Sequence, residues 1–205
     1  MPREDQFRVS RLAELSSARV NSLLCVKQRD ACGAQMDSRT FKIDDTPDPR
    51  RVESIKEALA GFEDASGTGF RLDTGHRKVE VDGHLAVKMA DVHVEGRHDD
   101  KYMRGYPILD HATLPDGLWQ TKLFNRFQNQ NTYGKRGARC FMPGLAFALT
   151  ADSRSVDLLF CLACRYLYAF RSDEPVTIPL SASGVSAMFE VYFSLFPDQR
   201  SRFDA

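Results

Sequence analysis

The longest apolar stretch of the chain, Val156–Phe170, sets the strongest limit on how this chain can fold. It reads Val-Asp-Leu-Leu-Phe-Cys-Leu-Ala-Cys-Arg-Tyr-Leu-Tyr-Ala-Phe and is interrupted only by Asp157 and Arg165. A membrane-spanning helix needs about 20 consecutive apolar residues, so this segment is too short to cross a bilayer. Near-continuous apolarity is typical of a strand whose two faces are both covered. We therefore predict a central buried strand, or a bent pair of strands, in the core of the domain.

Composition and charge exclude several classes of protein. The 205 residues include 14 phenylalanines and are 42% hydrophobic, enough for one sizeable domain with a core. The 28 Lys and Arg residues balance the 28 Asp and Glu residues, so nucleic acid, which is bound through excess positive charge, is not an expected partner. The charged start Met1–Phe7 is followed by no apolar run, so no secretory signal is expected. Together with five cysteines, an odd number, this favours reduced thiols in a cytoplasmic protein that does not contact a membrane.

The spacing of apolar residues predicts an α+β domain with a mainly antiparallel sheet, interleaved helices packed on it and a closing C-terminal helix. Asp48 is a suitable N-cap for a helix that ends near Gly61. Asp82-Gly83, between two alternating segments, predicts a hairpin. Asp116 would cap a helix that runs to about Gln128. The other expected elements are a helix over 10–22, strands at 23–26, 102–109, 138–150, 156–170 and 176–179, and a last helix, with Ser181 as its N-cap, that buries Val185, Met188, Phe189, Tyr192 and Phe196.

A change of pattern suggests where the chain divides. The segment Asp64-Ala-Ser-Gly-Thr-Gly69 combines glycines with small polar residues and is typical of a flexible joint. We therefore predict an N-terminal segment of helix and short strand over residues 1–66, packed on an α+β domain over residues 67–205.

Three motifs of the C-terminal half stand in order along the chain: Gly105-Tyr-Pro-Ile-Leu109, Arg139-Cys-Phe-Met-Pro143 and Val156–Cys164. Together they resemble a group of uncharacterised bacterial proteins that carry a GYPVLG strand, an ACFNPRHGI segment and a VDLVICFEC strand. The resemblance covers about residues 100–196 and implies an architecture but no activity. Where the group has Pro-Arg-His-Gly, this chain has Pro143-Gly-Leu-Ala146, so the Arg-His pair of the group is lost here.

Cys161 and Cys164, with Cys140 one strand earlier, are the residues whose spacing suggests chemistry. A CxxC pair supplies half of a tetrahedral zinc site and Cys140 could be a third ligand, but the chain has no second CxxC. Residues three apart in a regular strand point to opposite faces, so the two thiols converge only if the chain bends at Leu162-Ala163. We expect buried, reduced thiols that pack as small apolar residues, with a metal site or a redox pair as the alternatives.

Histidine and carboxylate side chains are concentrated in His93-Val-Glu-Gly-Arg-His98-Asp-Asp100. Such groups can hold a divalent metal or act as a general base. Their spacing matches no known ligand motif, so a solvated loop is the expected structure.

Three functions remain open from the sequence. The main hypothesis is a non-catalytic protein-binding module of inhibitor, immunity or adaptor type, which has a buried thiol-containing core strand, needs no cofactor and has another protein as its partner. The alternatives are a small zinc-stabilised domain built on Cys140, Cys161 and Cys164, or a metal-dependent hydrolase or nuclease that uses His93, His98 and Asp99.

Overall fold

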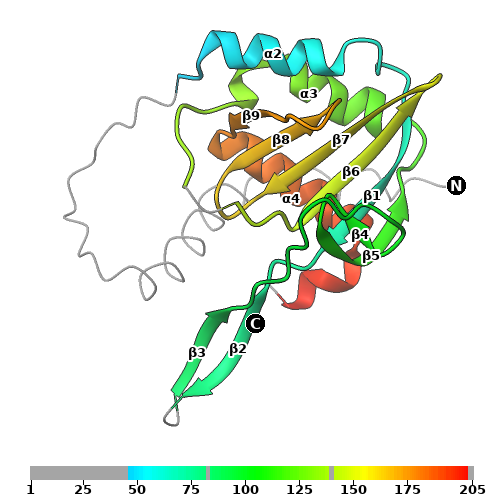
Figure 1. Ribbon diagram of the computed structural model, residues 1–205. Coiled ribbons are helices and arrows are strands. Elements are labelled where there is room, and N and C mark those ends of the chain that lie inside the picture. Colours follow the sequence, from blue (N-terminus) through cyan, green and yellow to red (C-terminus); the bar gives the residue numbers. More distant parts are fainter. Residues whose placement is uncertain (1–45, 82–83, 139–140, 203–205) are drawn as a thin grey trace, which may run out of the picture. The chain divides into compact units, whose positions relative to one another are not determined.

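The structure is a computed structural model that describes residues 46–81, 84–138 and 141–202. Residues 44–205 form one compact unit. This unit mixes helices with strands and consists mostly of a curled antiparallel sheet (Figure 1), as the apolar pattern predicts. The expected helix over 10–22 and strand at 23–26 lie outside the described residues. Among the described helices, none has the length and apolarity that crossing a membrane requires.

Seven strands form the main sheet in the order β4-β5-β1-β6-β7-β8-β9, and every neighbouring pair is antiparallel. β2 and β3 pair with each other in a separate two-stranded sheet. The predicted Asp82-Gly83 turn between these two strands lies outside the described residues. The strands are β1 Ser66–Leu72, β2 His76–Val81, β3 His84–Met89, β4 Tyr102–Met103, β5 Tyr106–Thr113, β6 Leu145–Ala151, β7 Arg154–Cys161, β8 Tyr166–Phe170 and β9 Val176–Pro179.

Helical segments connect the strands and contribute to the larger of two apolar clusters. Figure 1 shows α3 and α4 on one side of the sheet and α2 beside β9. This larger cluster joins buried residues of the helices, such as Ile55, Trp119 and Met188, to buried strand residues such as Phe147 and Phe160. The helical segments are α2 Pro49–Leu59, the π-helix η1 Leu118–Phe124, α3 Asn125–Gln128, the 3₁₀ helix η2 Gln130–Thr132, α4 Ala182–Leu195 and the 3₁₀ helix η3 Pro197–Arg202.

The predicted joint at Asp64–Gly69 is wrong, because most of it belongs to β1, an interior strand of the sheet. Its glycines are required by close packing rather than by flexibility. A Cβ atom on Gly67 would lie 2.4 Å from the carbonyl oxygen of Ala148, and one on Gly69 would lie 2.7 Å from the side chain of Leu195. Glycine in a strand often marks such a close approach of another chain segment.

The run Val156–Phe170 forms two strands, so the predicted bent pair is confirmed. β7 ends at Cys161, four residues turn, and β8 returns along it from Tyr166. Every residue from Val156 to Cys161 is buried, including Phe160 at 0% exposure. Both faces of β7 are therefore covered along this part of the strand.

Two predicted helix starts are correct and a third is not. Asp48 accepts a hydrogen bond from the Arg50 amide at 3.0 Å, and Ser181 caps α4 by accepting one from Gly184 at 3.0 Å. Asp116 caps nothing, because helix η1 begins after Gly117, whose φ is 74°, without a side-chain cap. The chain then forms a π-helix before α3, and Trp119, Leu123 and Phe127 are all buried.

The predicted strand 102–109 is divided into β4 and β5 by a turn at Arg104 and Gly105, whose φ angles are both positive. In the last helix, Val185, Met188 and Tyr192 are buried, as is Phe196 directly after it, whereas Phe189 is partly buried.

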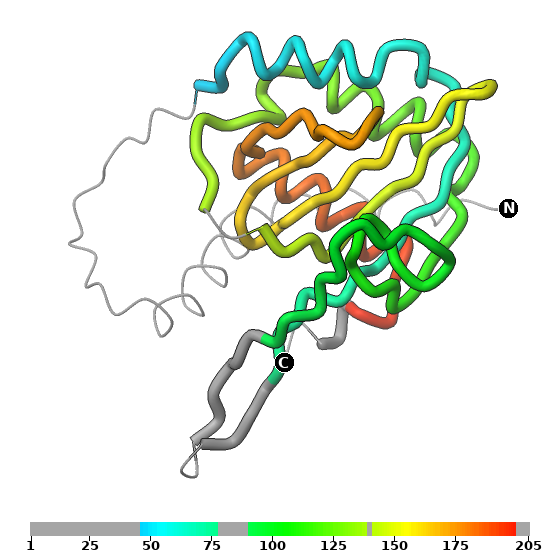
Figure 2. Tube along the Cα trace, in the orientation of Figure 1, coloured from blue at the N-terminus to red at the C-terminus, as the bar shows by residue number. Residues whose placement is uncertain are grey.

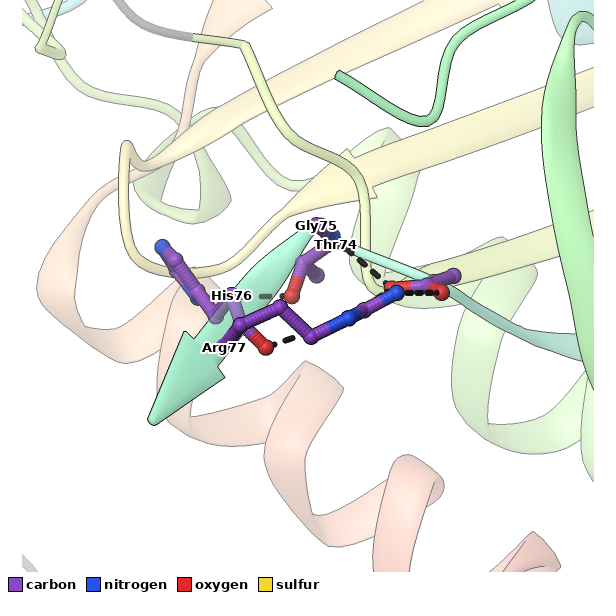
Figure 3. Close-up of polar contacts among 5 residues, drawn as sticks. Thr74, Gly75, His76 and Arg77 are labelled. Carbon is purple, nitrogen blue, oxygen red and sulfur yellow. Dashed lines mark hydrogen bonds and ion pairs between the residues drawn. The ribbon is translucent and has the colours of Figure 1, made fainter. Parts of the chain in front are cut away.

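The turn between β1 and β2 is held by Asp73, whose two carboxylate oxygens accept hydrogen bonds from the Arg77 guanidinium at 2.9 and 2.6 Å. One of these oxygens also accepts a hydrogen bond from the Gly75 amide at 2.8 Å. Figure 3 shows Arg77 extending back along the chain, past Gly75, toward this carboxylate. The Arg77 hydrogen bond lowers the pKa of Asp73 below its ordinary value.

Candidate functional site

Six half-buried aromatic side chains gather on the side of the sheet opposite the helix-linked core. We call this surface the aromatic face. It comprises Phe70 of β1, Tyr106 of β5, Phe141 before β6, and Tyr166, Tyr168 and Phe170 of β8. In β8 the burial pattern alternates, so that Leu167 and Ala169 enter the larger core while the three aromatic residues share the other face.

The aromatic rings are packed against one another. Phe141 stacks on Tyr168, with ring centroids 3.6 Å apart and planes 5° from parallel. Tyr106 meets the edge of Phe141 at 6.4 Å, and Tyr166 and Phe170 lie 6.5 and 6.3 Å from Tyr168. Tyr168 is therefore the centre of a connected aromatic surface.

A second, smaller apolar cluster lies beneath these rings. Its buried members are Leu72, Met103, Ala146 and Leu159, which come from four different strands. Its half-buried members include five residues of the aromatic face, and within the described residues no helix contributes to it. The aromatic face is thus built on strands and on the segment before β6.

A charged pair lies beside this cluster. Arg104 Nε donates a hydrogen bond to Asp157 Oδ2 at 2.7 Å, and the Asp157 side chain is almost fully buried. The same guanidinium lies 4.8 Å from the ring centre of Phe170. In Figure 2 the green part of the chain that carries β4 and β5 passes close to the yellow strands, which is consistent with this contact. The pair links the β4–β5 turn to β7 and β8.

An open groove of about 550 Å³ adjoins the aromatic face next to α2. Arg51 and Ser54 of α2 line it on one side, and Tyr166 and Tyr168 of β8 line it on the other. The remaining lining residues are Ala138, Phe141, Pro175, Val176 and Thr177.

Two phenol groups of the aromatic face remain protonated at neutral pH. Burial raises the pKa of both Tyr106 and Tyr168 above the ordinary value. The Tyr106 hydroxyl donates a hydrogen bond to the backbone oxygen of Phe141 at 3.4 Å. Because the single hydrogen of Tyr106 is used in this bond, Tyr168 is the neutral phenol of the two that can donate a hydrogen bond to a bound molecule.

The turn between β7 and β8 brings Cys161 and Cys164 together. The chain bends at Leu162–Arg165, and the Cys164 amide donates a hydrogen bond to Cys161 Sγ at 3.2 Å. The regular strand ends at Cys161, so the condition under which the two thiols were expected to converge, a bend at Leu162-Ala163, is met. The expected burial is confirmed, since Cys161 is 0% and Cys164 1% exposed. No disulfide joins the two in this structure, and Cys140 lies outside the described residues.

The histidine-rich segment 93–100 forms an exposed loop. Asp99 accepts hydrogen bonds from the Lys101 amide at 2.8 Å and from Arg97 Nε at 2.9 Å, which lower its pKa. His93 packs its ring 4.7 Å from that of Tyr106. Across the described ranges, no three His, Cys, Asp or Glu side chains are grouped as metal ligands would be.

The aromatic face itself was not identified from the sequence. One signal was available: Tyr166, Tyr168 and Phe170 alternate with Leu167 and Ala169, a period typical of a strand with two different faces. Phe70, Tyr106 and Phe141 come from distant segments of the chain. Only the order of the strands in the sheet shows that they lie on the same face as the aromatic residues of β8.

Comparisons with protein-family models, with curated proteins and with solved structures found no match to this chain.

Proposed function

We propose that this chain is a non-catalytic protein-binding module and that it binds its partner through the aromatic face. The observation that carries the proposal is the connected set of half-buried aromatic rings centred on Tyr168. In this proposal the interleaved helices, with α4 as the closing element, cover the other face of the sheet. The aromatic face would then be the part of the sheet left for a partner.

The chemistry of these side chains suits a protein interface. Tyrosine and phenylalanine bury a large apolar area with few rotatable bonds, and the tyrosine hydroxyl adds a hydrogen bond. Aromatic residues and arginine are enriched at the centre of protein interfaces and supply much of their binding energy. Connected apolar patches are rare on the surfaces of monomeric proteins and often mark binding sites.

The aromatic face is also held in place before binding. Phe141 is stacked between neighbours, and Arg104 is fixed by Asp157. A surface that is already ordered loses less conformational entropy when it binds. This supports recognition of a folded or extended protein segment that docks on these rings and reaches the groove beside Tyr166 and Tyr168.

Site-specific photocrosslinking tests the proposal. The photoreactive residue p-benzoylphenylalanine replaces Tyr166, which lines the groove, and the cells that express the variant are irradiated. The matched control places the same residue at Leu109, which is 49% exposed outside the aromatic face. We expect one protein to crosslink at position 166 and not at position 109.

The crosslinked protein is then purified and its affinity for this chain is measured. Tyr168→Ala should weaken binding by about tenfold or more, as expected for an aromatic residue at the centre of an interface, whereas Leu109→Ala should not. Equal crosslinking at both positions, or unchanged affinity in a folded Tyr168→Ala variant, would show that the aromatic face is not the binding surface.

A further inference from the structure

The β7–β8 turn brings the side chains of two cysteines, Cys161 and Cys164, into hydrogen-bond contact. Cys161 pairs with Tyr166 across the two strands, which leaves the four-residue loop Leu162–Arg165 between them. Loops of this length are most often built around a type I turn, whose first and fourth residues have Cα atoms within about 7 Å. Disulfides join residues whose Cα atoms lie about 4.4–6.8 Å apart. Cys161 directly precedes this loop and Cys164 is its third residue, so in a turn that starts at Cys161 the two cysteines are the first and fourth residues.

The two thiols differ in their surroundings. The Cys164 amide donates a hydrogen bond to Cys161 Sγ at 3.2 Å. The pKa of Cys161 is lowered, chiefly by a hydrogen bond from the Cys164 thiol and further by the amides of Met142, Cys164 and Ala163, against the opposing effect of burial. Thiolate is the reactive form of cysteine. Cys161 is therefore the sulfur suited to attack an oxidant first.

Burial restricts which oxidant can reach this pair. Cys161 and Cys164 are almost fully buried, whereas Ala163 between them is exposed, so the turn lies at the surface with its sulfurs directed inward. A bulky disulfide substrate cannot approach such sulfurs without opening the turn. A molecule as small as hydrogen peroxide needs much less room.

We propose that Cys161 and Cys164 are an oxidation site, at which hydrogen peroxide converts the two thiols into a disulfide within the β7–β8 turn. The Cys161 thiolate attacks one peroxide oxygen, the O–O bond breaks, and the hydroxide that leaves takes up the proton lost by the thiol. Cys161 then carries a sulfenic acid. The Cys164 sulfur attacks the Cys161 sulfur, the S–O bond breaks, and the leaving hydroxide takes the Cys164 proton. Two thiols and one peroxide thus yield one disulfide and two waters.

The chain is well suited to a direct test, because trypsin cleaves after Arg154 and Arg165 and releases both cysteines on one peptide, 155–165. Cys140 falls on a different peptide, 140–154. The reduced full-length chain is treated with hydrogen peroxide, its remaining thiols are alkylated in denaturant, and the peptides are weighed. We expect peptide 155–165 to lose the mass of two hydrogen atoms, to resist alkylation, and to recover both thiols after dithiothreitol.

Substitutions test the order of the two steps. In Cys164→Ala, the sulfenic acid at Cys161 has lost the Cys164 thiol and should be trapped by dimedone, whereas Cys161→Ala should give much less dimedone adduct at Cys164. Cys25→Ala is the matched control and should leave the disulfide unchanged. The mass measurement on the unmodified chain does not depend on the folding of any variant.

Three results would overturn the proposal. Peptide 155–165 could remain fully alkylated at peroxide concentrations that oxidise other cysteines of the chain. It could instead be linked to the peptide that carries Cys140. Elemental analysis of the reduced protein, purified without chelator, could show zinc that is lost in Cys161→Ala, which would assign the thiols to a metal site.

Discussion

Asp73 and Arg77 make the stability of the β1–β2 turn depend on pH. The Arg77 hydrogen bond, together with the Gly75 amide, holds the pKa of Asp73 below its ordinary value. A carboxylate whose pKa is lowered on folding contributes stability above its unfolded pKa, about 3.9, and that contribution is lost as the pH falls through the folded pKa.

Asp73→Asn tests this linkage, because asparagine can still accept the Gly75 hydrogen bond but carries no charge. We expect the variant to be less stable than the unmodified chain at neutral pH, by a difference that shrinks below about pH 4. The difference in the free energy of unfolding between the two proteins is measured by urea unfolding, followed by circular dichroism, at several pH values. Asp116→Asn, at an exposed position without a capping role, is the control. A difference that stays constant into the acid range would contradict the assignment.

At the scale of single elements, β1 depends on the absence of a side chain at Gly67. A Cβ atom there would lie 2.4 Å from the Ala148 carbonyl oxygen, so the paired backbones must move apart. We expect Gly67→Ala to lower the free energy of unfolding by about 1–3 kcal/mol, as overpacking does. At Gly144 the nearest atom to an added Cβ is 3.4 Å away, so Gly144→Ala should be neutral or stabilising by up to about 1 kcal/mol. Equal effects of the two substitutions in urea unfolding would contradict this reading.

The elements that the sequence predicted best are those whose signal is local. Asp48 and Ser181 cap their helices through contacts two or three residues away, and the β2–β3 hairpin follows from a two-residue turn. The assignment failed at Asp64–Gly69, where the glycines are explained by Ala148 and Leu195, far along the chain. At Cys161 the sequence left one strand and a bent pair of strands as alternatives, because nothing local marks the end of β7 there.

At the scale of the whole molecule, α4 contributes buried side chains to the larger cluster. Its buried residues share one cluster with Phe147, Leu158 and Phe160 of the sheet. We expect a chain truncated after Pro179 to expose these apolar side chains and to be insoluble. A chain truncated after Phe196 keeps α4 and should remain soluble. Sedimentation of the two expressed proteins compares them, and a soluble, folded product that ends at Pro179 would contradict the role given to α4.

The candidate site was less predictable than the fold because it depends on contacts between residues that lie far apart in the sequence. Its residues come from β1, β5, β8 and the segment before β6, which adjoin only through the sheet order β5-β1-β6-β7-β8. A sequence pattern shows that Tyr166 and Tyr168 share a face of one strand. It does not show which other strands place aromatic residues beside them.

The indole of Trp119 gives this protein an internal optical probe. Trp119 is the chain's single tryptophan, is 1% exposed, and donates a hydrogen bond to the Phe62 carbonyl just after α2. It belongs to the larger cluster and not to the aromatic face. Excitation of the indole therefore reports whether α2 and η1 remain docked, while substitutions at Tyr166 or Tyr168 should leave its emission maximum unchanged. A variant that loses binding but keeps the emission maximum of Trp119 has therefore lost its binding surface and not its fold, and this is established without a label.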